Sequence, residues 1–152
     1  VEHAQEGDGP LLVDHERHGD RRQVVASRWA VGAVAARLED HVVAQENLQA
    51  AVDDASKSMD CEDLLALALS DLALVHQEWG DDIEARRLLL QALAIGREIA
   101  MAQRWPDRWN AMREHARRLD VKMFCAHIGV PALDFDDENY GGTLRQMFLD
   151  RD

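Results

Sequence analysis

An internal repeat with an offset of 41 residues is the feature that most constrains the fold of this chain. Residues 28–52, shifted by 41, fall on residues 69–93 of the stretch 69–95, and small, apolar and acidic positions coincide. The matched pairs are Val31-Gly32 with Leu72-Ala73, Glu39-Asp40 with Gly80-Asp81, Ala44 with Ala85, Leu48 with Leu89, and Ala51-Val52 with Ala92-Leu93. Small residues let the two helices of a hairpin pack closely. The Glu-Asp and Gly-Asp pairs provide a turn and a helix N-cap. Two helical hairpins of the same kind are therefore predicted.

Apolar residues at spacings of three and four indicate helices over the rest of the chain, whereas sustained period-two alternation is absent. One stripe predicts a helix over about residues 82–103, and a second predicts a helix over about residues 107–127, ended by Gly129 and Pro131. Gly96 lies within the first stripe and should weaken that helix by roughly 1 kcal/mol relative to Ala. The predicted chain is all-α.

Composition narrows the class of protein. A chain of 152 residues with 47% hydrophobic and 30% charged residues fits one globular domain. The formal charge of −12 argues against direct nucleic-acid binding, because phosphate contacts need an excess of Lys and Arg. No apolar run is long enough to span a membrane. Cys61 and Cys125 are isolated, which favours a reducing, cytoplasmic location. A start at Val1 without Met suggests a piece of a longer protein.

The repeated positions resemble the tetratricopeptide repeat. Its pattern combines a large apolar residue, Leu-Gly, Tyr, a Gly-Asp turn, Ala, Phe or Leu, Ala and a closing Pro. The second unit matches at Leu69, Leu72, Ala73, Gly80, Asp81, Ala85, Leu89, Ala92 and Ile95, and the first at Gly32, Ala44, Leu48 and Ala51. The chain departs at Ala35 and His76, where Tyr is usual, and at Arg97, where the Pro is missing. The resemblance covers about residues 19–103. It implies antiparallel helical hairpins stacked as a short right-handed superhelix, with a C-terminal capping helix and tail.

The period of 41 exceeds the standard repeat of about 34 residues. Without the closing Pro, the second helix is expected to run on by about two turns, until Trp105-Pro106 stops it. Core packing is the expected role of both Trp105 and Trp109. Long repeats of this kind are similar to the helical arrays of large bacterial regulators, in which an ATPase module and a helix-turn-helix domain flank the repeats.

The repeat pattern predicts five segments. Residues 1–18 are expected to hold the last helix of a preceding repeat, residues 19–60 the first repeat and residues 61–104 the second. Residues 105–130 are expected to form a third-repeat or capping helix, and residues 131–152 an acidic loop with a short terminal helix. The apolar and acidic side chains of this tail predict that it folds back on the array beside the basic capping helix.

Signs of catalysis are scarce. His15 and His18 are spaced to offer two nitrogens to a metal, but no third ligand is placed, so a solvated helix face is favoured. Cys125 would need a distant histidine, His76 or His115, to become a nucleophile, and an inert buried thiol is favoured instead. Phosphate loops and hydrolase motifs are absent. We therefore expect no catalytic residue, no metal and no cofactor.

The resemblance also implies a binding groove, because the first helix of each hairpin lines the concave face in this family. By position, the groove candidates are Trp29, Ala33, Arg37, Ser70, Leu74, Gln77 and Glu78, with Arg113 and Arg117 from the third helix. The family's carboxylate clamp needs Lys and Asn, and this chain has Trp29, Ala33, Ser70 and Leu74 at those places, which puts that specificity in doubt. Trp29 is the best candidate anchor, since Trp dominates interface hot spots. Packing of Trp29 between helices is an equal alternative.

The leading hypothesis is a non-catalytic module that binds another protein or a peptide, within a larger bacterial regulator. It has no direct nucleic-acid or membrane partner, and self-association of the array is a further expectation. One alternative is a small-molecule sensor with its ligand in a groove around Trp29 and Leu74. A helical enzyme is the other. A closed apolar pocket would favour the sensor, and an open concave face would favour the peptide binder.

Overall fold

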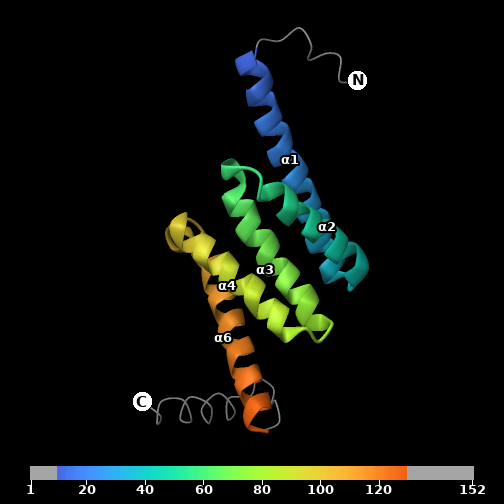
Figure 1. Ribbon diagram of the computed structural model, residues 1–152, viewed down its shortest axis with the longest axis vertical. Coiled ribbons are helices and arrows are strands. Elements are labelled where there is room, and N and C mark those ends of the chain that lie inside the picture. Colours follow the sequence, from blue (N-terminus) through green and yellow to red (C-terminus); the bar gives the residue numbers. More distant parts are fainter. Residues whose placement is uncertain (1–9, 130–152) are drawn as a thin grey trace.

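The computed structural model describes the backbone of residues 10–129 and the side chains of residues 20–129. The elements within this part follow one another as α1 (Pro10–Arg37), α2 (His41–Ala55), η2 (Met59–Cys61), α3 (Glu62–Glu78), α4 (Asp82–Glu98), α5 (Met101–Arg104) and α6 (Pro106–Ile128). The helices run antiparallel in sequence order, with α1 and α2 at one end of the array and α6 at the other (Figure 1). The predicted all-α stack of helical hairpins is confirmed.

The two hairpin turns are built alike. Glu39 and Gly80, which are 41 residues apart, both adopt a left-handed backbone with φ of 61° and 81°. The aspartate that follows each of them caps the next helix. The side chain of Asp40 accepts a hydrogen bond from Val43 N, and that of Asp81 accepts one from Glu84 N. The turn and the N-cap were both predicted from the aligned pairs.

Small side chains hold the helices of each hairpin together. Ala85 and Ala92 are fully buried, as the aligned positions predict, and so are their first-repeat counterparts Ala44 and Ala51. Gly32 on α1 lies so close to α2 that an added Cβ would be 2.6 Å from Leu48 Cγ. The close approach of α1 and α2 therefore depends on a glycine, whereas the second hairpin has Ala73 at that position.

The second helix of the second hairpin is shorter than predicted. Instead of one helix over residues 82–103, α4 ends at Glu98, and Ala100 has a left-handed backbone with φ of 56° before the short α5 begins. The turn brings Met101 into the core and α6 against α4. Gly96 allows this packing, because a Cβ there would lie 2.7 Å from Trp109 Cζ3. Trp105 and Trp109 both pack against the core, as expected.

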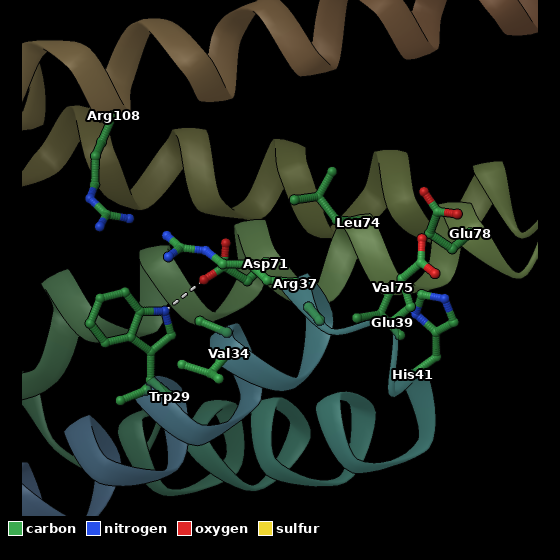
Figure 2. A pocket seen from close by; sticks show the side chains of 13 residues that line it. Trp29, Val34, Arg37, Glu39, His41, Asp71, Leu74, Val75, Glu78 and Arg108 are labelled. Atoms are coloured by element: carbon green, nitrogen blue, oxygen red, sulfur yellow. Dashed lines mark hydrogen bonds between the residues drawn. The ribbon is translucent and has the colours of Figure 1, made fainter.

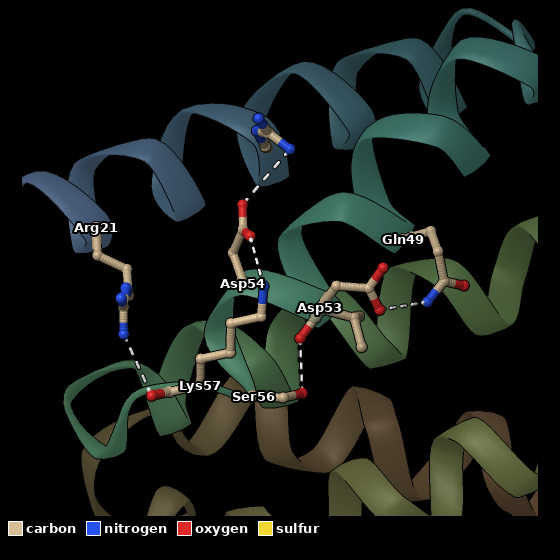
Figure 3. A network of polar contacts seen from close by, with 8 residues as sticks. Arg21, Gln49, Asp53, Asp54, Ser56 and Lys57 are labelled. Atoms are coloured by element: carbon tan, nitrogen blue, oxygen red, sulfur yellow. Dashed lines mark hydrogen bonds and ion pairs between the residues drawn. The ribbon is translucent and has the colours of Figure 1, made fainter.

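The explanation of the long period is also corrected. α2 ends at Ala55 and α4 at Glu98, so neither helix runs on by two turns, and a link of residues 56–61, which contains η2, separates α2 from α3. Polar contacts hold this link and the end of α2 in place (Figure 3). Arg21 of α1 donates a hydrogen bond to the Lys57 carbonyl of the link at 3.3 Å, Arg28 of α1 pairs with Asp54 at the end of α2 at 3.4 Å, and Ser56 Oγ donates to the Val52 carbonyl of α2. The link is therefore an ordered part of the repeat.

The first helix continues across the boundary expected between residues 18 and 19. α1 is one helix from Pro10 to Arg37, so residues 10–18 extend the first-repeat helix rather than forming a separate remnant. The remainder of that predicted segment, residues 1–9, lies outside the described residues, and so do the side chains of His15 and His18.

α6 (Pro106–Ile128) occupies the segment predicted for the capping helix. It begins directly after Trp105, and Gly129, with φ of 78°, is its C-cap. Pro131 and the predicted tail at residues 131–152 lie outside the described residues, so the docking of the tail stays a prediction. None of the described helices has the length and apolar character needed to cross a membrane.

Candidate functional site

The face shared by α1, α3 and α6 carries two adjoining hollows, of about 560 Å³ and about 460 Å³. Both are bounded by Asp71, Leu74 and Arg108, so they form one continuous groove across the first helices of the three units. The larger hollow lies mainly between α1 and α3, and the smaller between α3 and α6 (Figure 2 shows the larger). We call this the concave groove.

Helical spacing explains which side chains reach the concave groove. Trp29, Ala33 and Arg37 follow one another at steps of four on α1, and residues four apart share a face of a helix. The same offset of 41 brings Ser70, Leu74 and Glu78 to the equivalent face of α3, and all six residues line the hollows. On α6 the offset leads to Ala111 and His115, which line the smaller hollow. The lining is therefore a repeated feature of the sequence.

Trp29 stands in the groove with its indole fixed in place. Its Nε1 donates a 2.7 Å hydrogen bond to Asp71 Oδ2 on the neighbouring helix (Figure 2). The guanidinium of Arg108, from α6, lies 5.4 Å from the centre of the indole ring, within reach of a cation–π interaction. Trp29 also packs partly against the core. One tryptophan therefore joins α1, α3 and α6 and presents part of its ring to the groove.

The partner of the indole, Asp71, is in an unfavourable place for a charge. Burial raises the pKa of the Asp71 carboxyl above its ordinary value. The hydrogen bond from Trp29 and the positive charges of Arg108 and Arg37 lower that pKa, but by less. The Asp71 carboxyl, held by the indole N–H and facing Arg108 and Arg37, is therefore a fixed polar group in the groove wall.

A second polar pair joins α3 and α6 beside the smaller hollow, which His115 lines and Gln77 does not. His115 Nε2 on α6 and Gln77 Oε1 on α3 form a hydrogen bond of 2.5 Å. The pKa of His115 is lowered, mainly by burial and further by the charge of Arg118. A neutral imidazole donates from one ring nitrogen, which suits the amide oxygen as acceptor. Gln77 thus orients a lining residue.

The middle of the concave groove is apolar. Val34 and Leu74 project into it with more than two fifths of their surface exposed (Figure 2). Beyond them, Glu39, Glu78 and His41 line the end near the hairpin turns. His41 Nδ1 is buried and has no hydrogen-bond partner within the part of the chain that the structure describes. The groove therefore has an arginine-rich end at Trp29, an apolar centre and an acidic end.

The structure brings together most of the residues predicted for the groove. Trp29, Ala33, Arg37, Leu74 and Glu78 line the larger hollow, and Ser70 and Leu74 line the smaller one. Arg113 and Arg117 do not line it. Arg113 is exposed elsewhere on α6, and Arg117 makes an ion pair with Glu114.

Sequence reasoning missed three lining residues that carry the polar chemistry, namely Asp71, Arg108 and His115. A further step of 41 from Leu74 would have found His115. Asp71 interrupts an apolar run, which is the sequence signal of a buried polar group. Arg108 has no counterpart in the repeat pattern, and its position became clear only once α6 was placed.

Other chemistry is not assembled in the part of the chain that the structure describes. Within residues 20–129, no group of three or more His, Cys, Asp or Glu side chains is placed to hold a metal ion. Cys61 and Cys125 are fully buried, and neither forms a disulfide bond.

A comparison with family models gave a match to the model described as tetratricopeptide repeat over residues 23–98, which is half of the chain. Comparisons with curated proteins and with solved structures gave no match. The matched residues begin within α1 and end at the last residue of α4, so they contain both hairpins.

Proposed function

Because this chain belongs to the tetratricopeptide-repeat family, we propose that it is a non-catalytic module that binds a segment of another protein in the concave groove. Repeats of this family generally mediate protein–protein interaction. The observation that carries the proposal is the indole of Trp29, which Asp71 and Arg108 fix on the groove wall. Fixed aromatic side chains lose little entropy on binding and are frequent hot spots.

The chemistry of the groove indicates the kind of segment. Leu74 and Val34 offer an apolar centre, which fits an aliphatic or aromatic side chain of the partner. Arg37 and Arg108 at the tryptophan end favour an acidic group beside that side chain. The buried His41 Nδ1, which has no hydrogen-bond partner among the described residues, suits a polar group of a bound segment.

A terminal-carboxylate clamp is not part of this proposal. The positions that hold Lys and Asn in clamp-bearing members of the family are Trp29, Ala33, Ser70 and Leu74 here. They line the concave groove but supply no positive charge. The acidic group is therefore proposed to lie at Arg108, on α6.

The shape of the groove favours a polypeptide over a small molecule. The two hollows join through Asp71, Leu74 and Arg108 and cross three helices, whereas a small-molecule site encloses most of the surface of its ligand. An extended or helical segment could contact both hollows at once. We keep the small-molecule sensor as the alternative. The placement of the array in a bacterial regulator also remains a proposal, supported by the 41-residue period.

A selection from a peptide library displayed on phage tests the proposal. Peptides that bind the immobilised chain are measured against the variants Leu74→Gln and Leu90→Gln. These leucines have similar exposure, 45% and 43%, but Leu90 lies on α4 outside the concave groove, so it is the matched control.

Burial of a leucine contributes about 1.5–3 kcal/mol, so Leu74→Gln should weaken binding by roughly 10-fold or more. The control should bind as the wild type does. Binding in this groove would be refuted if both variants lost peptide affinity equally. It would also be refuted if the selected peptides bound Leu74→Gln as tightly as they bind the wild type.

A further inference from the structure

We propose that the segment bound in the concave groove carries a basic residue at the end lined by Glu39 and Glu78, in addition to the acidic residue at the arginine-rich end. This inference rests on the proposed function and adds to it the charge order of the segment, which sets the direction in which the segment lies. We keep the name acidic end for the part of the groove that Glu39 and Glu78 line.

The acidic end is formed by two exposed glutamates from different hairpins. Glu39 lies in the turn between α1 and α2, and Glu78 is the last residue of α3. Within the described residues, neither carboxylate has an ion pair or a side-chain hydrogen bond, whereas Glu84 on α4 pairs with Arg87. The acidic end therefore presents two negative charges that the described part of the array does not neutralise.

Both arginines that line the larger hollow serve its other end. Arg37 is the last residue of α1, and the offset of 41 makes it the counterpart of Glu78. Although Arg37 is two residues from Glu39, its guanidinium turns toward Asp71, and the charges of Arg37 and Arg108 both act on that carboxyl group (Figure 2). The two hairpins thus place opposite charges at equivalent positions. A segment with charges of one sign would be repelled at one end of the groove.

Helix geometry gives the distance between the two charged ends. Asp71 and Glu78 are seven residues apart on α3, which is about 10 Å along the axis at 1.5 Å per residue. An extended segment advances about 3.3 Å per residue, so its acidic and basic residues should be about three positions apart. Leu74 lies between the two ends on α3 and would contact an apolar residue between them. The expected pattern is therefore an acidic residue, an apolar residue and a basic residue within about four positions.

The parts of this chain outside the described residues do not contain that pattern. Residues 1–9 have no Lys or Arg. Residues 130–152 have Arg145 and Arg151, and neither has an acidic residue two, three or four positions away. A segment of a partner protein with both charges therefore complements the groove better than either end of this chain does.

Selection from the phage-displayed peptide library, carried out on the whole chain and on its Glu78→Lys variant, tests the charge order. Peptides that bind the wild type and depend on Leu74 should carry an acidic and a basic residue about two to four positions apart. Glu78→Lys should weaken their binding about 3- to 10-fold, because exposed ion pairs are weak but the reversed charge also repels. Lys at the last residue of a helix interacts favourably with the helix dipole, so the variant should fold.

The reciprocal change in the peptide separates charge recognition from misfolding. Replacement of the basic residue of such a peptide by Glu should restore its affinity for Glu78→Lys and weaken its affinity for the wild type. A misfolded variant could not produce that recovery. Glu46→Lys is the matched control, because Glu46 is an exposed residue of α2 that lines neither hollow, and its replacement changes the net charge by the same amount. It should bind as the wild type does.

Three results would overturn the charge order while binding in the groove still stood. They are Leu74-dependent peptides that lack a basic residue, equal losses in Glu78→Lys and Glu46→Lys, and a Glu-substituted peptide that does not recover affinity for Glu78→Lys. A selection that yields no Leu74-dependent peptide, as expected if residues 130–152 filled the groove, would overturn both the charge order and the proposed function.

Discussion

The two turn residues with a left-handed backbone occupy equivalent sites, and mutations at these sites should change the stability in opposite directions. Glu39 and Gly80 both have φ near the left-handed region, but only one of them is a glycine. A non-glycine residue there costs about 1–2 kcal/mol. Replacing it with glycine also raises the entropy of the unfolded chain, which offsets about 0.4–1 kcal/mol. Glu39→Gly should therefore raise the free energy of unfolding by about 0.5–1 kcal/mol, which is the difference between those two effects.

Gly80→Ala should act in the other direction. A Cβ at Gly80 meets no atom within 4 Å, so its cost is purely conformational, and we expect a loss of about 1 kcal/mol. Urea unfolding followed by circular dichroism at 222 nm measures the free energy of unfolding of both variants. We expect their m-values to equal that of the wild type. Glu39→Ala is the control, because it removes the charge and keeps the strain, and its midpoint should move little. A Glu39→Gly variant no more stable than Glu39→Ala would refute the strain argument.

The remaining predictions concern packing and the groove. Gly32→Ala should lower the free energy of unfolding by about 1–3 kcal/mol, since its Cβ would overlap Leu48, and adding Leu48→Ala should make the effect of Gly32→Ala smaller in a double-mutant cycle. Ala85→Leu should overpack the second hairpin and lower the free energy of unfolding by a similar amount. An unchanged unfolding midpoint in denaturant would contradict the placement of Ala85 at a helix crossing. Asp71→Asn keeps an acceptor for Trp29 and removes the charge of a partly buried carboxyl group. The folded pKa of Asp71 is raised, so ionisation opposes folding; this cost is absent below the unfolded pKa of about 3.9 and develops as pH rises through the folded pKa. The variant should therefore gain stability relative to the wild type between about pH 4 and pH 7, and a difference that stays constant with pH in urea titrations would contradict this.

Local and periodic features were predictable from the sequence. The offset of 41 places Ala85 and Ala92 at helix crossings and Asp40 and Asp81 at N-caps, because hairpin packing and capping depend on residues close in sequence. The same periodicity predicts which face of α1 and α3 lines the concave groove. These outcomes follow from helix geometry alone.

Features that depend on tertiary packing were not predictable in the same way. The end of α4 at Glu98 depends on Trp109, which arrives from α6 and packs at Gly96, so the apolar stripe alone suggested a longer helix. The unbroken α1 was missed because its boundary was inferred from the period, whereas the turn sequence of residues 56–61 has no counterpart in residues 15–20. The Trp29–Asp71–Arg108 cluster joins three helices, and a local sequence pattern does not predict contacts between side chains of different helices.

The four tryptophans provide the most direct test of the central claim, that the concave groove is the binding surface. Each indole N–H gives its own signal in a ¹H–¹⁵N correlation spectrum, which can be followed as a library-selected peptide is added. Trp29 lies in the groove, whereas Trp79, which is 49% exposed, lies beside the second hairpin turn and lines neither hollow. Binding in the groove predicts that the Trp29 signal shifts and saturates while the Trp79 signal stays in place. A saturating shift of Trp79 with an unmoved Trp29 would contradict the account.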